Sequence, residues 1–168
     1  MKLISLGLLF FGAMCYSQSP EDPEKYFDFW VGEWDATWDE GDGKLGKGTN
    51  RIAKTLDDKV IVENFEITEG QSKGFKGTSI SVYQAAVKTW KQSWADNQST
   101  FYYFQGKLDG EMRIFQTDVF DTQDGRKITQ RMVFKDIRED SMTWDWESSV
   151  DGGETWNLNW RIDYKRRK

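Results

Sequence analysis

The stretch that decides the fold reads Phe27-Asp28-Phe29-Trp30-Val31-Gly32-Glu33-Trp34. Its aromatic run ends at Gly32, and over residues 32–39 apolar and polar side chains then alternate, as in a half-buried β-strand. Upstream, Pro23 follows Asp22, a pairing typical of the first turn of a helix. We therefore predict a short helix over residues 23–30 that plugs the floor of a β-barrel, followed by the first strand.

The rest of the chain repeats this two-residue period in segments separated by short turns. The pattern predicts further strands at residues 45–55, 60–68, 76–83, 88–96, 99–107, 111–120, 127–137, 141–149 and 156–164. Asp109-Gly110 is a strong hairpin signal. A sandwich or a barrel would accommodate such a series, and closure favours the barrel because it removes exposed edges. We expect an all-β protein, a single up-and-down antiparallel barrel of about ten strands.

The N-terminus is typical of an export signal. Lys2 precedes an apolar stretch over residues 3–14, and cleavage after Ser17 would place the small residue Cys15 at the −3 position. The stretch is too short for a stable membrane span. We expect residues 1–17 to be a signal peptide, residues 18–168 to be one domain, and the protein to be secreted or periplasmic. A lipoprotein anchored at Cys15 is the less favoured alternative, since the large Met14 would precede the lipidated cysteine.

Charge and composition exclude several classes of function. The chain has 23 basic and 28 acidic residues, and loss of Lys2 with the leader leaves 22 against 28, a net charge of −6. That balance argues against nucleic acid and anionic lipid as partners. The mature chain would hold no histidine and no cysteine, which excludes disulfides, thiolate nucleophiles, Cys/His zinc sites and Ser-His-Asp triads. We expect no metal and no cofactor.

Gly32-Glu33-Trp34 resembles the Gly-x-Trp signature of lipocalin-like (calycin) barrels. In that group the Trp closes the barrel floor, and an Arg near the last strand packs across it. The resemblance implies a structural role for Gly32 and Trp34, with Arg166 or Arg161 supplying the arginine.

A second motif lies near the C-terminus. Residues 149–156 match the Asp-box pattern Ser-x-Asp-x-Gly-x-Thr-Trp at every fixed position. The pattern predicts a hairpin in which the Asp151 carboxylate accepts turn N–H groups, Gly153 takes a positive φ, and Trp156 packs underneath. Asp-boxes of sialidases lie away from the catalytic centre, and one box cannot build a propeller. We predict a structural role here too.

Four segments together resemble an uncharacterised family of exported bacterial domains of unknown function in the calycin group. They are residues 27–34, 88–96 and 146–156, and the Tyr164-Lys165-Arg166 ending. The likeness covers nearly the whole mature chain and implies a barrel of this strand number without an established activity. Nitrobindin-like relatives bind haem through a histidine. This chain has none, so haem is not expected.

Several side chains are candidates for a ligand site inside the barrel, where small barrels hold one ligand among apolar walls and a few polar groups. The lumen candidates are Glu63, Trp94, Tyr102, Arg131, Trp144, Trp146 and Glu147. The polar members could instead form the solvated face of their strands. Alternation alone does not fix which face points inward, because both faces carry aromatic residues on several strands. Within a lumen, we expect Arg131 to pair with a ligand carboxylate, or with Glu63 or Glu147.

The favoured hypothesis is therefore a protein that binds a small, largely apolar molecule. The alternatives are an enzyme, such as a lyase or glycan hydrolase, and a structural protein of the cell envelope. The enzyme would need two carboxylates of divergent pKa facing one cavity, with Glu63 and Glu147 as candidates. Fold alone does not choose between these functions.

Overall fold

Side chains alternate between buried and exposed positions along the strands of this molecule, as the burial pattern of the first strand, β1 (Gly32–Asp39), illustrates. The structure, a computed structural model, describes residues 22–168, so the predicted signal peptide and Cys15 lie outside the described residues. The further strands are β2 (Leu45–Thr55), β3 (Val60–Glu69), β4 (Lys76–Gln84), β5 (Thr89–Asp96), β6 (Phe101–Asp109), β7 (Met112–Gln116), β8 (Phe120–Asp121), β9 (Lys127–Lys135), β10 (Ser141–Ser149) and β11 (Asn157–Arg166). Three short 3-10 turns complete the elements: η1 (Pro23–Lys25), η2 (Asp28–Trp30) and η3 (Ala85–Val87).

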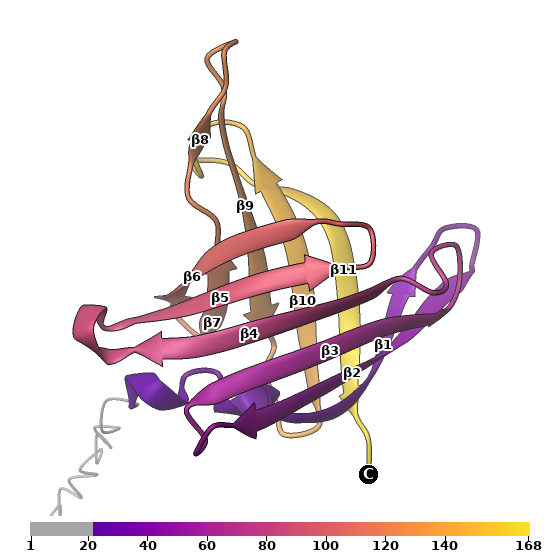
Figure 1. Cartoon of the computed structure of the whole chain (residues 1–168). Coiled ribbons are helices and arrows are strands. Elements are labelled where there is room, and N and C mark those ends of the chain that lie inside the picture. Colours follow the sequence, from indigo (N-terminus) through magenta and orange to yellow (C-terminus); the bar gives the residue numbers. More distant parts are fainter. Residues whose placement is uncertain (1–21) are drawn as a thin grey trace, which may run out of the picture.

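The strands form a closed antiparallel barrel of ten strands with β8 as one extra strand, which confirms the predicted fold class (Figure 1). Successive strands pair from β1 to β7, β7 pairs with β9, and β9 continues to β10 and β11. The pairing of β11 with β1, with Trp34 opposite Arg166, closes the ring. The first and last strands are therefore joined at the floor.

One predicted strand, residues 111–120, is split into β7 and β8. At the break, Thr117 Oγ1 accepts a hydrogen bond from the backbone N–H of Gln130, at 3.0 Å. The Thr129 hydroxyl in turn donates to the Thr117 carbonyl, at 3.1 Å. Side-chain hydrogen bonds thus replace part of the backbone hydrogen-bond ladder between these strands. The alternation of residue types does not reveal this break.

The predicted N-terminal helix is present as the two 3-10 turns η1 and η2. Asp22 caps the first turn by accepting from the N–H of Glu24, at 3.1 Å. The break between the turns directs Phe27 and Trp30 into the barrel, where they are 1% and 2% exposed. Phe27 stacks on Phe115 with ring centroids 4.2 Å apart. The turns therefore plug the floor with aromatic rings.

The predicted clasp between Trp34 and Arg166 is present across this floor. Trp34 is fully buried, and the Arg166 guanidinium carbon lies 4.0 Å from the centroid of its ring system. Arg166 also donates to the carbonyls of Val31 and Phe29, at 2.7 and 2.9 Å. Arg161, the alternative, is wrong for this role because it binds Asp145 on the outer face.

The Asp-box forms the predicted hairpin between β10 and β11. Asp151 accepts from the backbone N–H of Glu154 at 3.1 Å and of Thr155 at 3.0 Å, and Gly153 has a φ of +97°. Hydrogen bonds from the Ser149 and Thr155 side chains hold the pKa of Asp151 well below its usual range. Trp156 donates to the Gly153 carbonyl, at 3.1 Å. The box is a structural turn, as predicted.

Candidate functional site

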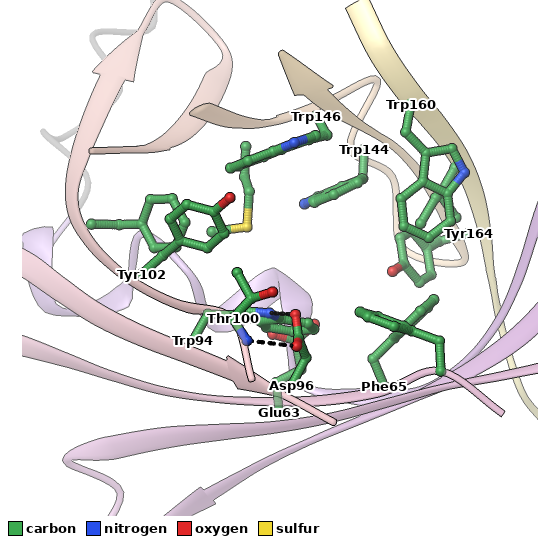
Figure 2. A pocket seen from close by; sticks show the side chains of 14 residues that line it. Glu63, Phe65, Trp94, Asp96, Thr100, Tyr102, Trp144, Trp146, Trp160 and Tyr164 are labelled. Carbon is green, nitrogen blue, oxygen red and sulfur yellow. Dashed lines mark hydrogen bonds between the residues drawn. The ribbon is translucent and has the colours of Figure 1, made fainter. Parts of the chain in front are cut away.

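A cavity of about 240 Å³ lies inside the barrel, with Glu63 in its wall (Figure 2). It is lined by Glu63, Phe65, Phe75, Trp94, Asp96, Thr100, Tyr102, Phe104, Met132, Trp144, Trp146, Trp160, Ile162 and Tyr164. These side chains come from six strands and two loops, because every second residue of each strand points inward. The wall is thus mostly aromatic, with a few polar groups.

The aromatic walls pack against one another at short range. Trp144 and Trp146, two residues apart on β10, stack with ring centroids 6.4 Å apart and planes 6° from parallel. Trp160 of β11 meets Trp144 edge-on at 5.8 Å, and Tyr102 of β6 lies 5.6 Å from Trp146. Such contacts fix the rings in place. The cavity therefore has preformed aromatic faces on one side.

A buried carboxylate, Glu63, forms part of the opposite wall. Its side chain accepts from the amide of Asn50 and the hydroxyl of Ser79, both at 2.7 Å. Burial raises the pKa of Glu63 from 4.5 to about 7, although these two hydrogen bonds partly offset the effect. Near neutral pH, Glu63 in the unliganded protein therefore exchanges between a carboxylate and a carboxylic acid.

Further buried polar groups surround Glu63 and form a layer across the barrel. Asn50 also donates to the Tyr164 hydroxyl at 3.3 Å, and Gln92 donates to the Ser81 hydroxyl at 2.9 Å. Burial, and secondly the charge of Glu63, raise the pKa of Tyr164 far above its usual value. Two acceptors of this layer, Asn50 Oδ1 and Gln92 Oε1, have no hydrogen-bond partner among the described residues.

A second carboxylate, Asp96, lines the cavity where β5 ends. It accepts from the N–H groups of Gln98 and Thr100, at 2.9 and 3.0 Å. The indole of Trp94 also donates to it, at 3.3 Å. Burial by itself would raise the pKa of Asp96, but hydrogen bonds from Thr100, Trp94 and Gln98 outweigh it and lower the pKa. Two carboxylates with opposite pKa shifts therefore face one cavity.

The structure brings five of the seven lumen candidates together: Glu63, Trp94, Tyr102, Trp144 and Trp146. The prediction that Arg131 and Glu147 face the lumen is wrong. They alternate with the cavity residues Met132 and Trp146, so they project from the outer face, where they form an ion pair of 2.6 Å. Arg131 also lies over the ring of Trp156, at 3.9 Å.

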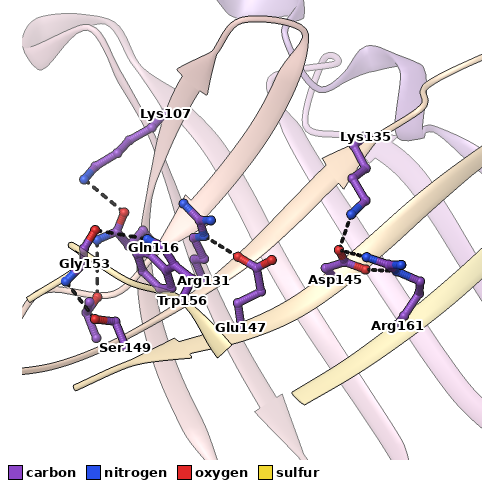
Figure 3. A network of polar contacts seen from close by, with 11 residues as sticks. Lys107, Gln116, Arg131, Lys135, Asp145, Glu147, Ser149, Gly153, Trp156 and Arg161 are labelled. Carbon is purple, nitrogen blue, oxygen red and sulfur yellow. Dashed lines mark hydrogen bonds and ion pairs between the residues drawn. The ribbon is translucent and has the colours of Figure 1, made fainter. Parts of the chain in front are cut away.

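A second polar cluster on this outer face contains Asp145, whose side chain is 1% exposed (Figure 3). Arg161 donates two hydrogen bonds of 2.7 Å to its carboxylate, and Lys135 pairs with it as well. Burial would raise the pKa of Asp145, but the hydrogen bonds and charges of Arg161 and Lys135 keep it below its usual value. This buried carboxylate is fully compensated by cations of the same chain.

Asp145→Asn is expected to lower the free energy of unfolding at pH 7 by about 2 kcal/mol, because hydrogen bonds to a charged group are lost. In the wild type, this stabilisation is present above the ordinary pKa of an aspartate and is lost as the pH falls through the depressed pKa. Urea unfolding of both proteins measures the difference. Asp163→Asn, at an exposed outer-face position, should change stability by less than about 0.5 kcal/mol; equal losses would contradict the expectation.

Sequence reasoning missed several cavity residues, among them Asp96 and Tyr164. Asp96 shares its face of β5 with Trp94, and Tyr164 shares its face of β11 with Trp160 and Ile162. Extending the parity of a strand to its last residue would have found both. The role of Asn50 could not be found this way, because it depends on the register of β2 with β3.

Comparisons with protein-family models and with curated proteins find nothing that matches this chain. Within residues 22–168, no helix has the length and apolar character needed to cross a membrane.

Proposed function

We propose that this protein is an exported β-barrel that binds one small, largely apolar molecule in its aromatic-lined lumen. The observation that carries the proposal is the cavity of about 240 Å³, walled by aromatic rings and containing a few oriented polar groups. Ligand sites combine these features, apolar walls for affinity and a few placed polar groups for orientation. The volume is below the ~300–1,000 Å³ of sites for drug-sized compounds, so the ligand is small.

The proposal includes membership of the calycin group and export. The floor clasp of Gly32, Trp34 and Arg166 supports the first. The leader-like residues 1–17 support the second. The intact mass of the protein from its own periplasm or medium tests export: a chain that begins at Gln18 is expected. A diacylated chain that begins at Cys15 would instead identify a lipoprotein.

Native mass spectrometry of the gently purified mature protein tests the binding function. We expect a small molecule that remains bound under native conditions and is lost on denaturation, because unfolding separates the strands whose side chains line the cavity. Its mass begins to identify the ligand class. A clean unliganded mass from protein purified from its own compartment would contradict the proposal.

A blocking variant tests whether this cavity is the site. Thr100→Trp places a large ring at a cavity-lining position. It keeps the backbone N–H that donates a hydrogen bond to Asp96. We expect the affinity for the co-purifying compound to fall at least about tenfold, equivalent to ~1.4 kcal/mol. Thr55→Trp, at an exposed position near the end of β2, is the matched control and should bind as the wild type does. Equal binding by both variants would place the ligand elsewhere.

A second candidate function is acid–base catalysis on a molecule held in the same cavity. It is favoured by the opposite pKa shifts of Glu63 and Asp96, since separated carboxylate pKa values assign an acid and a base. Asp96 takes the place that the sequence hypothesis gave to Glu147. Incubating the identified ligand with the protein distinguishes the functions: conversion that is lost in Glu63→Gln indicates an enzyme, and an unchanged ligand indicates a binding protein.

A further inference from the structure

The charged side chains that line the cavity are all acidic. Glu63 and Asp96 line it, and among its described lining residues there is no lysine or arginine. Where a ligand meets two carboxylates and no basic side chain, an anionic ligand would be repelled and a cationic ligand attracted. The lining therefore favours a cationic ligand over an anionic one.

Two buried carboxylates of this chain differ in whether a basic side chain neutralises their charge. Asp145 on the outer face is compensated by Lys135 and Arg161. Glu63 is also buried, at 6% exposed, but within residues 22–168 its side-chain hydrogen bonds come only from neutral groups, those of Asn50 and Ser79. A buried charge without a counter-ion is costly. Glu63 lines a cavity that can hold a small molecule, so a ligand can supply the missing positive charge.

The aromatic walls are suited to the same charge. Trp144, Trp146 and Trp160 pack together at one side of the cavity, with Tyr102 beside them. The faces of aromatic rings attract cations, and tryptophan attracts them most strongly. Aromatic rings that surround an ammonium group are a known mode of recognition for such ligands. Their apolar area also suits the hydrocarbon part of an amine.

The polar layer around Glu63 holds two buried acceptors that have no partner among the described residues. They are Asn50 Oδ1 and Gln92 Oε1, on side chains that are 1% and 2% exposed. A cationic group that neutralises Glu63 would lie near these two oxygens. Their partial negative charges therefore add to the preference of Glu63 for a positive charge.

From these four observations we infer that the ligand is a small organic cation, an ammonium group on an apolar body, whose charge lies between Glu63 and the tryptophan faces. The inference rests on the proposed binding function and names its ligand class. Asp96 adds to the negative field at the end of β5, and the ligand's hydrocarbon part fills the remaining aromatic space.

Three probes of similar size and different charge test the inference by isothermal titration calorimetry on the mature protein. They are 2-phenylethylammonium, 2-phenylethanol and phenylacetate. At pH 8 we expect the cation to bind at least about tenfold more tightly than the alcohol, and phenylacetate to bind most weakly. Equal or tighter binding of the alcohol overturns the cation inference and leaves the binding function intact. Binding of none of the three overturns the inference, and native mass spectrometry then decides the binding function by itself.

The pH dependence of the wild type is a readout that needs no variant. The other titratable groups that line this cavity are Asp96, Tyr102 and Tyr164. With the pKa of Glu63 near 7, its ionised fraction falls about tenfold from pH 8 to pH 6. Over that range the depressed pKa of Asp96 keeps it ionised and the raised pKa of Tyr164 keeps it neutral. We expect the affinity for 2-phenylethylammonium to fall about tenfold, and a flat profile would overturn the role of Glu63.

Glu63→Gln, which keeps the shape and removes the charge, should lower the affinity ratio of cation to alcohol well below its wild-type value, leaving only the preference that Asp96 and the tryptophan faces supply. Glu33→Gln makes the same chemical change at an exposed position and should retain the wild-type ratio. A Glu63→Gln protein that still prefers the cation tenfold would overturn the inference. Should that variant fail to fold, the pH profile of the wild type decides.

Discussion

Gly32→Ala is expected to lower the free energy of unfolding by about 3–5 kcal/mol, the sum of a backbone cost and lost charge-assisted hydrogen bonds. Gly32 has a φ of +142°, and a Cβ atom there would lie 2.1 Å from Nη1 of Arg166. The guanidinium would have to leave the carbonyls of Val31 and Phe29 and the face of Trp34. Urea unfolding, followed by far-UV circular dichroism, measures the loss.

A matched control and a double-mutant cycle separate the two causes. Gly43 has a φ of +72°, and no atom lies within 4 Å of the position that a Cβ would take there, so Gly43→Ala should cost only about 1 kcal/mol. In an Arg166→Met background, Gly32→Ala should cost less than in the wild type, because the guanidinium is no longer displaced. Strict additivity of the two substitutions would contradict the clasp as the cause.

Glu63→Gln is expected to stabilise the unliganded protein by roughly 3 kcal/mol above pH 7 and to flatten its stability between about pH 4.5 and 7. The pKa of Glu63 is raised by burial to about 7, against 4.5 ordinarily. Between pH 4.5 and 7 the folded wild type therefore keeps on Glu63 a proton that the unfolded chain has lost, so the contribution of Glu63 to stability is greatest below pH 4.5. That contribution declines as the pH rises to about 7, where the folded protein must hold a buried charge. Glutamine has no such charge.

Unfolding free energies at several pH values between 4 and 8 measure this difference. Glu111→Gln, an exposed glutamate at the β6–β7 turn, should leave the pH dependence of the wild type unchanged. A Glu63→Gln protein that loses stability between pH 4.5 and 7 as steeply as the wild type would show that Glu63 is not the titrating group. A Glu63→Gln protein less stable than the wild type at pH 8 would show that its hydrogen bonds outweigh its burial.

The strands and the Asp-box were predictable because each depends on neighbours along the chain. β1, β2 and β10 begin and end where alternation predicts. The Asp-box closes through contacts within residues 149–156. The split of the predicted strand 111–120 was not predictable, since it depends on hydrogen bonds between Thr117 and its partner strand.

The candidate site was only partly predictable, because alternation separates two faces without saying which one points inward. On β9 and β10 both faces are largely hidden. The guanidinium of Arg131 covers the ring of Trp156 on the outside while Met132 lines the cavity inside, and long charged side chains can cover apolar surface in this way. Arg131 and Glu147 therefore looked as suitable for a lumen as Glu63 did.

The sequence alone predicted an all-β barrel with an aromatic floor and an Asp-box hairpin, since those features follow from local periodicity and a short motif. The Gly-x-Trp resemblance added a clasp on Trp34 but left Arg166 and Arg161 open, and the structure chose Arg166. Only the tertiary structure decided which carboxylate received counter-ions. Register and closure placed Asp145 between Lys135 and Arg161, and enclosed Glu63 with neutral donors beside a cavity. The energy of a buried charge depends on what surrounds it in space, and those surroundings come from strands far apart in the chain.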